Sequence, residues 1–527
     1  MAISIAWLAG MLAAFRPTLL SGLARIQTDL GDTRLANYIL EHGYRWLIGA
    51  PGHERFWSPP VFFPAPNTAA YSDVLFTVAP VYWFWRALGA APDTAFQLWM
   101  LTMATLNVVA AYLLLRRALH CSAVASAVGA FLFAFAGVRS AQLEHPQLLP
   151  QFYTIVAVYA LVRLFERNSD TSHAFGWLAV FSASVVAQLY AEFYYGWFLC
   201  FVIAICALWA LLIPQSRAAL LALLRRHWLP LTLGVAGGAA LLAPLAIHYL
   251  SAAHVLGPRG FSTAAAMVPR PLSWIDLGPD NWLYGPLANT SAMRAIPAGL
   301  EQRLGLGVVT LCVAAWGLAL APSRRLAALL GLTALTIVVI ATRWTDGIVL
   351  WRLVFALVPG AAALRAVARI GILLLLPASI GVAFWIDAQW SRWHWRAAPV
   401  IAWLVLLVVA EQWQARLPSF DKSDGRTRVA RVASSVDRRC RSFFYTPLAG
   451  TEDPWWYQTD AMWASMERDV PTVNGYSGNW PNGWRFYPIV ARTPADSAIL
   501  ARNLARWIAQ WHLDARSVCT VALVPYD

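Results

Sequence analysis

Charged residues are few in this sequence, and acidic residues are the scarcest of them. Asp and Glu together number 27 among 527 residues, all charged residues make up 13% of the chain, and 59% of the residues are hydrophobic. A soluble domain carries charged residues at about 25%. The composition therefore excludes an ordinary soluble protein and indicates an integral membrane protein with many spans. The chain is longer than one membrane unit with short loops, so we also expect a soluble part.

Motifs of soluble nucleotide chemistry are missing as well. The sequence contains no phosphate-binding loop that ends in Gly-Lys-Ser/Thr, no Gly-x-Gly-x-x-Gly and no Cys-x-x-Cys pair. The net charge of +13 comes almost entirely from arginine, because Lys422 is the only lysine. No basic run with interleaved aromatic residues is present, so we expect no nucleic-acid partner. Basic membrane proteins usually owe such charge to the cytoplasmic ends of their spans.

Apolar runs of spanning length, or nearly so, predict about 11 transmembrane helices. We expect the first to be a retained helix, because the basic segment of a signal peptide is missing before it. Two further segments, 74–90 and 348–358, are either spans or helices that lie in the membrane interface. The predicted spans are 1–20, 97–115, 122–138, 148–164, 174–190, 194–213, 229–250, 304–320, 326–341, 370–387 and 397–411.

Arginine clusters accompany every second predicted span and set the topology. If neither 74–90 nor 348–358 crosses the membrane, all the clusters fall on one side, which the positive-inside rule makes cytoplasmic. The clusters are Arg116-Arg117, Arg163 with Arg167, Arg217 with Arg225-Arg226, Arg324-Arg325, and Arg392 with Arg396. The opposite, outer side then receives the long first loop (about 25–96), 139–147, Glu192, 251–303, 342–369 and everything after about 412.

Hydropathy falls and charge rises at about residue 412. We therefore expect two domains, a transmembrane domain over 1–411 and a small soluble α/β domain over 412–527. In the second, 441–446 and 517–524 are predicted strands. Residues 495–513 are a predicted amphipathic helix, with Thr493 as its N-cap and Pro494 in its first turn.

The six cysteines divide by this domain boundary. Four of them lie in or beside apolar segments and are expected to be packing residues, namely Cys121, Cys200, Cys206 and Cys312. Cys440 and Cys519 lie in the predicted soluble domain, each next to a predicted strand. If that domain is periplasmic, these two can form a disulfide. The alternative is a pair of free buried thiols.

Asp29 and Asp32 follow directly on the first apolar segment, in a chain that otherwise avoids acid. Two carboxylates at the mouth of a membrane helix are candidates for a catalytic base. Residues 35–46 have helical spacing, which would put Asp32 at the N-terminus of a helix. The alternatives are that Asp32 is simply the N-cap of that helix, and that Asp29 is an interfacial carboxylate paired with an arginine.

Further polar residues collect on the predicted outer side, where they are costly beside a membrane unless paired or used. Glu144 and His145 are either a hydrogen-bonded structural pair or part of a site. Glu192, with Tyr194 and Tyr195, could bind a divalent cation together with Asp32 and His145, although their spacing carries no metal signature. The loop 251–303 is long, which favours a functional lid. The candidate site-lining residues are Arg34, His42, Tyr71, Asp73, Arg139, Glu144, His145, Glu192 and Tyr195.

Arg365 and Arg369 lie one helical turn apart just before the apolar run 370–387, so they would point the same way. The planar donors of a guanidinium match phosphate oxygens. The pair could therefore hold a phosphate at the bilayer surface. The alternative is that both side chains extend to lipid headgroups.

These features together resemble the GT-C superfamily of membrane glycosyltransferases, which use polyprenyl-phosphate-linked sugars. The shared order is a first helix, a long outer loop that opens with an acidic residue, many spans and a soluble outer tail. Narrower motifs look like a bacterial branch of that superfamily, although its paired acidic motif is spread here as Asp29-x-x-Asp32. These motifs are Gly31-Asp32-Thr33-Arg34, Glu41-His42, Phe63-Pro-Ala-Pro-Asn67 with Tyr71-Ser-Asp73, Leu364-Arg-Ala-Val-Ala-Arg369 and Asn474-Gly-Tyr-Ser-Gly478.

The resemblance implies a mostly α fold, a GT-C-like helix bundle in a bacterial inner membrane with a periplasmic C-terminal domain. It also implies inverting transfer of a sugar from a polyprenyl-phosphate-linked donor to a glycan, lipid or protein acceptor. Asp32 would act as the base, with Asp29 as the close competitor, because a base must reach the acceptor hydroxyl. Arg365 and Arg369 would hold the leaving phosphate.

Two other classes of function also fit the sequence. A lipid or glycan transporter, or flippase, would share the many spans and the intramembrane charges. It would more often show internal repeats and broken helices at corresponding positions, and we find no such repeat. A non-catalytic protein of envelope assembly could have the same fold, and it would tolerate the loss of Asp29 and Asp32.

Overall fold

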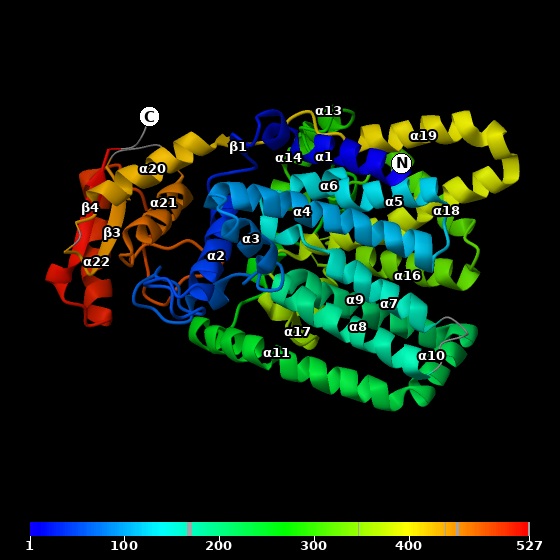
Figure 1. The fold of residues 1–527 in the computed structure, drawn as a ribbon, viewed down its shortest axis with the longest axis horizontal. Helices are drawn as coiled ribbons and strands as arrows, with labels where there is room; N and C mark the ends of the chain where they lie inside the picture. Colours follow the sequence, from blue (N-terminus) through cyan, green and yellow to red (C-terminus); the bar gives the residue numbers. More distant parts are fainter. Residues whose placement is uncertain (166–170, 346, 438, 449–452, 488, 525–527) are drawn as a thin grey trace.

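A computed structural model describes residues 1–524, apart from 166–170, 346, 438, 449–452 and 488. Arg167, from one of the predicted arginine clusters, lies outside the described residues. Long helices run side by side to form a bundle, and the C-terminal part of the chain forms a small domain at one end of it (Figure 1).

Apolar helices at all the predicted spans build this bundle, so the chain is a multi-pass membrane protein. In the described part of the chain, 9 segments are long and apolar enough to cross a membrane. One of them, Val367–Glu411, contains two helices, and the 12-residue α15 is a shorter apolar helix. The helices are α1 (Ala2–Leu20), α4 (Pro92–Leu113), α5 (Ala123–Phe135), α7 (Phe152–Leu164), α8 (Thr171–Ala191), α9 (Phe193–Leu212), α11 (Trp228–Leu256), α15 (Val308–Ala319), α16 (Arg324–Ala341), α18 (Leu375–Trp393) and α19 (Ala398–Glu411).

The two ambiguous segments form helices too short to span. The segment 74–90 contains α3 (Ala79–Ala87), of 9 residues, and 348–358 contains α17 (Trp351–Leu357), of 7 residues. At 1.5 Å per residue, both are shorter than about 15 Å, half the thickness of the hydrocarbon core. Neither crosses the membrane, which is the condition under which the arginine clusters share one side.

The bundle has two chemically different ends. The arginine-containing α10 (Pro214–Arg226) and the turn between α18 and α19 lie at the end away from the C-terminal domain (Figure 1).

Within the bundle, α15 and α18 pack backbone to backbone. A Cβ added to Gly317 would lie only 1.7 Å from the carbonyl oxygen of Gly381. Small residues permit such close helix packing in membranes.

The first outer loop is tied to the C-terminal part of the chain. It begins with β1 (Arg25–Ile26), which pairs antiparallel with β2 (Phe420–Asp421), and it continues into α2 (Asp32–Leu47). Short helices also organise the other outer loops, so the long loop 251–303 has structure of its own. These are α6 (Gly137–Ala141), α12 (Ser262–Ala265), α13 (Gly285–Ala288) and α14 (Ser291–Arg294).

The C-terminal domain is a small α/β unit, as predicted. Strands β3 (Ser442–Pro447) and β4 (Val518–Leu523) are parallel, with Phe443 opposite Cys519. The predicted helix is α22 (Pro494–Gln510), and Thr493 caps it in a capping box with Asp496. Two helices that we did not predict complete the domain, α20 (Lys422–Ser435) and α21 (Pro454–Arg468).

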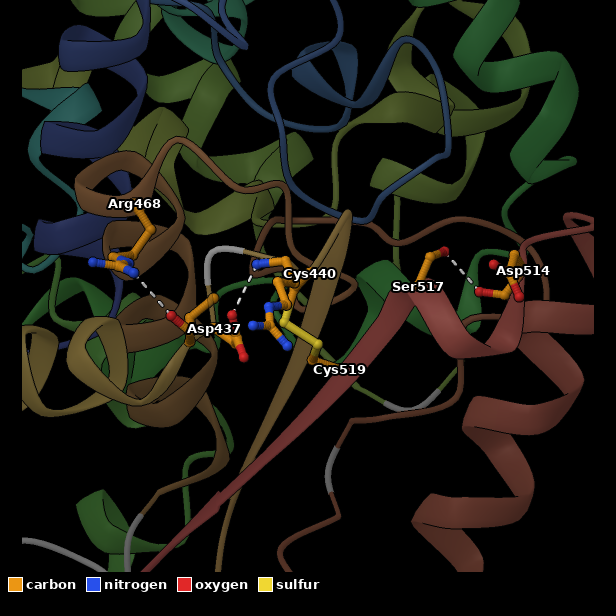
Figure 2. The surroundings of a disulfide bond; sticks show 8 residues. Asp437, Cys440, Arg468, Asp514, Ser517 and Cys519 are labelled. Atoms are coloured by element: carbon orange, nitrogen blue, oxygen red, sulfur yellow. Dashed lines mark hydrogen bonds between the residues drawn. A yellow bond between two sulfur atoms is a disulfide. The ribbon is translucent and has the colours of Figure 1, made fainter.

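Cys440 and Cys519 are joined by a disulfide between the start of β3 and β4 (Figure 2). The two residues are 79 positions apart in the sequence, and their Cα atoms lie 5.7 Å apart. Within the described residues, the other four cysteines are free thiols. The bond links β4 to the residue two positions before β3.

The C-terminal domain does not pack by itself alone. One hydrophobic core combines Leu35, Tyr38 and Phe62 of the first outer loop with Phe444 and Trp484 of the C-terminal domain. Backbone hydrogen bonds reinforce this junction, since the amide of Phe62 donates to the carbonyl of Asn474 at 2.8 Å. The first loop and the C-terminal domain therefore share one core at the end of the bundle where that domain lies.

Candidate functional site

The site begins where α2 begins, at Asp32. Gly31 is the N-cap residue of α2, and it has no side chain that could accept a hydrogen bond from the first turn. Asp29 Oδ1 accepts one instead, from the Thr33 amide at 3.3 Å. The interpretation of Asp32 as the N-cap is therefore wrong, because Asp32 lies one residue too late. Asp29 contacts the helix N-terminus instead of pairing with an arginine, which leaves the Asp32 carboxylate free to point elsewhere.

Asp32 forms the first link of a chain of charged side chains drawn from separate outer loops. Its Oδ2 lies 2.5 Å from His145 Nδ1, and its Oδ1 accepts a hydrogen bond from the Tyr476 hydroxyl. His145 Nε2 lies 3.2 Å from Glu301 Oε1. Glu301 in turn accepts two hydrogen bonds from the Arg369 guanidinium, at 2.6 Å and 3.1 Å. Four outer segments and the C-terminal domain thus meet at one point.

Opposite charges determine the protonation states of Asp32, His145 and Glu301. Burial and the charge of Arg369 lower the pKa of His145, but its hydrogen bonds to Asp32 and Glu301 outweigh both and raise the pKa to about 9. Burial raises the pKa of Asp32, and the hydrogen bond and charge of His145 more than reverse this, so that the pKa is lowered overall. The pKa of Glu301 is also lowered, because the nearby Arg369 and His145 outweigh its burial. At neutral pH His145 is therefore an imidazolium between two carboxylates.

We expect the thermal stability of the outer site to fall as the pH rises through about 9. The pKa of His145 is higher in the folded state than the unfolded value of about 6.5, so its stabilising effect is complete below that value and is lost as the pH rises through about 9. The measurement is the unfolding temperature of detergent-purified protein at several pH values for the wild type and His145→Gln. The difference between them should shrink above pH 9. A His254→Gln control, at an exposed histidine, should follow the wild type.

Two further carboxylates lie beside this chain. Burial and the charge of Asp32 raise the pKa of Asp29. Burial and the charge of Asp29 likewise raise the pKa of Glu144. Asp29, Asp32 and Glu144 therefore form one electrostatically linked acidic group, and only Asp32 in it is held ionised by a direct contact with His145.

A second acidic pair lies at the N-terminus of α9. Glu192 accepts hydrogen bonds from the amides of Tyr194 at 3.0 Å and Tyr195 at 2.5 Å, and Asp73 accepts one from the Phe193 amide at 2.9 Å. Burial, together with the charge of Asp73, raises the pKa of Glu192 well above its usual value. Burial also raises the pKa of Asp73. Both carboxylates are engaged by the helix N-terminus, which favours negative charge there.

The two arginines predicted to bind phosphate differ in their surroundings. Arg369 is buried and its charge is balanced by Glu301, while its guanidinium also lies over the ring of Tyr194 at 5.1 Å. Arg365 is exposed, and its backbone amide donates to the Tyr194 hydroxyl at 3.0 Å. No carboxylate in the described part of the chain forms an ion pair with Arg365.

Arg259, which sequence reasoning missed, is a second cation without a carboxylate partner among the described residues. Its guanidinium donates to the carbonyl of Ala363 at 2.8 Å and to Asn479 Oδ1. Burial lowers the pKa of Arg259, and the charge of the neighbouring Arg365 lowers it further. Two positive charges that lie this close repel each other, and an anion between them would relieve that repulsion.

Several predicted lining residues have partners outside this cluster. The Arg34 guanidinium pairs with Asp460 of α21 at 2.5 Å, and His42 Nδ1 lies 2.7 Å from His53 Nδ1. Burial lowers the pKa of His42 to about 4. Arg139 donates to Gln151 at 2.6 Å. Tyr71 and Tyr195 are buried, the former beneath Asn479, which donates to the Tyr71 carbonyl at 3.1 Å.

Besides Arg259, the site residues that sequence reasoning did not assign are Glu301 and Tyr476. Glu301 has the same sequence signal as Asp32, since it is an acidic residue on the predicted outer side of an acid-poor chain. Its loop is so long that the sequence does not show which of the loop's residues reach the site. Tyr476 lies within the motif Asn474-Gly-Tyr-Ser-Gly478, to which the sequence alone assigned no role. Its contact with Asp32 depends on how the C-terminal domain packs, which no local pattern reveals.

A divalent cation does not fit this donor set. Among the residues that the structure describes, no group of three or more His, Cys, Asp or Glu side chains is arranged to hold a metal ion. Asp32 faces His145 and Tyr476, the second nitrogen of His145 faces Glu301, and Glu192 accepts backbone amides. The positive charge beside these carboxylates comes from His145 and Arg369, so a metal ion would have to displace contacts that these side chains already make.

The comparisons with known proteins concern the fold. No family model matches the sequence, and no curated protein matches it. Among solved structures it is similar to the Archaeoglobus fulgidus oligosaccharyltransferase in complex with Zn and sulfate, at 10% identity and a TM-score of 0.50, over 90% of this chain and 62% of that chain. The chain thus spans less than two thirds of the length of that enzyme.

Two further structures are similar to a lower degree. The same oligosaccharyltransferase in its apo form has 11% identity and a TM-score of 0.49, over 90% of this chain and 64% of that chain. ArnT from Cupriavidus metallidurans in the apo state has 12% identity and a TM-score of 0.39, over 89% of this chain and 84% of that chain. The first likeness is one of fold alone, and it agrees with the polytopic helix bundle that the sequence predicts.

Proposed function

We propose that the protein is a membrane glycosyltransferase, which transfers a sugar from a polyprenyl-phosphate-linked donor to an acceptor hydroxyl. The reaction takes place at the end of the bundle that carries the C-terminal domain, which we propose to be the periplasmic side of a bacterial inner membrane. One observation carries the proposal. The ionised Asp32 lies at the same end of the bundle as Arg259 and Arg365, two arginines that have no carboxylate partner among the described residues. The similar fold of an oligosaccharyltransferase supports it.

Asp32 acts as the base in this proposal. Its carboxylate stays ionised at neutral pH because His145 and Tyr476 contact it, and its side chain keeps 21% of its surface exposed to an incoming acceptor. The acceptor oxygen attacks the anomeric carbon, the bond from that carbon to the phosphate oxygen breaks, and the acceptor proton passes to Asp32. Attack from the face opposite the phosphate inverts the anomeric centre. Since positive charge develops on the sugar as the phosphate departs, a weakly basic carboxylate suffices to take the proton late.

The leaving phosphate departs with the electron pair of the broken bond and needs positive charge nearby. In this proposal Arg365 supplies it together with Arg259. Arg369 has a different role, because Glu301 already balances its charge. In this proposal it orients Glu301 and, through His145, the Asp32 carboxylate. This assignment changes our expectation that Arg365 and Arg369 act as a pair.

Release of lipid phosphate tests the function directly. Purified protein in lipid nanodiscs is incubated with decaprenyl-phosphate-linked hexoses and pentoses and with hydroxyl acceptors, including water, diacylglycerol and N-acetylglucosamine oligomers. We expect decaprenyl phosphate to be released with at least one donor. Arg259→Gln and Arg365→Gln should each raise KM by about 10- to 100-fold, since one charge-assisted contact contributes about 1.5–3 kcal/mol.

Arg55→Gln serves as the matched control, because Arg55 is an exposed arginine of the same outer loop system. Its KM should equal that of the wild type. If none of the donors releases decaprenyl phosphate, the transferase function is rejected. Transport of an intact lipid-linked sugar across the membrane of reconstituted vesicles would favour a flippase. An unchanged KM in both arginine variants would show that the phosphate lies elsewhere.

A further inference from the structure

Four aromatic side chains of the C-terminal domain form a continuous cluster beside the proposed site. The rings of Trp455 and Tyr487 are stacked, with centroids 3.6 Å apart and planes inclined by 21°. Tyr476 lies next to Trp455 at 5.0 Å, and Trp480 lies next to Tyr487 at 5.6 Å. We call Trp455, Tyr476, Trp480 and Tyr487 the aromatic platform.

Core packing explains only part of the platform, because Tyr476 and Tyr487 pack against the core that contains Phe444 and Trp484. Trp455 and Trp480 belong to none of the hydrophobic cores that the described residues form. Trp480 keeps 42% of its surface exposed, and the other three rings are half-buried. Large exposed aromatic groups on one surface usually mark a binding site.

One end of the platform contacts Asp32, and at the other end the residue that precedes Trp480 binds Arg259. At one end, the Tyr476 hydroxyl donates to Asp32. At the other, Arg259 donates to Asn479, the residue before Trp480. The platform therefore extends from the proposed base to one of the proposed phosphate cations.

A sugar ring is the one substrate part that must lie between those two ends. One face of a pyranose carries mostly C–H bonds with partial positive charge, and the face of an aromatic ring carries partial negative charge. The two surfaces attract each other, and the hydroxyl groups at the sugar edge remain available to polar neighbours such as Asn479.

We infer that the aromatic platform of the C-terminal domain binds a sugar ring of the substrate and holds it between Asp32 and Arg259. The inference rests on the proposed transferase function, and it assigns sugar recognition to the C-terminal domain. Contact with the membrane surface is the competing explanation, because Trp and Tyr also collect where proteins meet the headgroups.

Saturation-transfer NMR tests binding of the sugar without requiring turnover. The probes are methyl glycosides of glucose, mannose, galactose and N-acetylglucosamine, added to the full protein in nanodiscs. We expect at least one glycoside to receive magnetisation from the wild type. Trp455→Ala and Tyr487→Ala should weaken its binding by about tenfold, as the loss of one stacked ring predicts. Tyr487→Phe should restore it, because the ring and not the hydroxyl makes the contact.

Trp282→Ala is the control, since Trp282 is a 62% exposed tryptophan on another outer loop. It should bind the glycoside like the wild type. Wild-type protein that binds no glycoside, or a Trp455→Ala variant that binds as well as the wild type, would overturn the inference and favour contact with lipid. The protein could also bind the glycoside in a way that depends on Trp455 and yet release no lipid phosphate. That result would reject the transferase function and support sugar binding by the platform.

Discussion

Asp32→Asn should lower the rate of lipid-phosphate release by about 10²–10⁴-fold, the contribution usual for a positioned acid or base. The amide keeps the shape of the carboxylate but cannot accept the acceptor proton, and it removes one of the two negative charges that flank His145. The measurement is kcat in the nanodisc assay with the best decaprenyl-phosphate-linked donor. Binding of the donor should change little, because Asp32 does not contact the proposed phosphate site.

Asp29→Asn is the variant that makes this test decisive. Asp29 is three residues away and is the same type of side chain, but its carboxyl group is turned to the amide of Thr33. We expect it to lose less than about tenfold in kcat, mainly through the altered charge around Asp32. A greater loss in Asp29→Asn than in Asp32→Asn would move the base to Asp29. Wild-type turnover in both variants would favour the non-catalytic role in envelope assembly.

The sequence was sufficient for the bundle because hydrophobic length and arginine placement are local properties. It was also sufficient for β3, β4 and α22, where the alternation of strand residues and the capping residue Thr493 lie within a few positions of each other. It identified Asp32, His145, Arg365 and Arg369 as outer polar residues because charge is rare beside a membrane.

The links between these residues could not be predicted in the same way. Arg365 and Arg369 look equivalent in sequence, one helical turn apart, yet only Arg369 meets a carboxylate, and that carboxylate is Glu301. The partner comes from a loop more than sixty positions earlier, and its position depends on the packing of that loop. The platform aromatics have the same limitation, since Tyr476 reaches Asp32 only because the first loop and the C-terminal domain share a core.

Asp460→Asn should destabilise the junction between α2 and the C-terminal domain by about 3–5 kcal/mol, the cost of breaking a buried ion pair. One carboxylate serves two arginines here. Its Oδ1 accepts from Arg34 at 2.5 Å, and its Oδ2 accepts from Arg428 at 2.6 Å. All three side chains are at least nine-tenths buried, so solvent cannot replace the lost charge. The measurement is the unfolding free energy of the detergent-purified protein, followed by near-UV circular dichroism.

Asp469→Asn provides the matched control at the end of the same helix, α21. Asp469 contacts Arg45 at 3.5 Å and is 53% exposed, so its loss should cost less than about 1 kcal/mol. The double variant Arg34→Met with Asp460→Asn should cost less than the sum of the two single changes, because it no longer leaves a buried Arg34 beside a neutral partner. Strict additivity would contradict a direct interaction between them. If the pair does hold the junction, Asp460→Asn should also weaken turnover at temperatures near its own transition, since Tyr476 then no longer stays on Asp32.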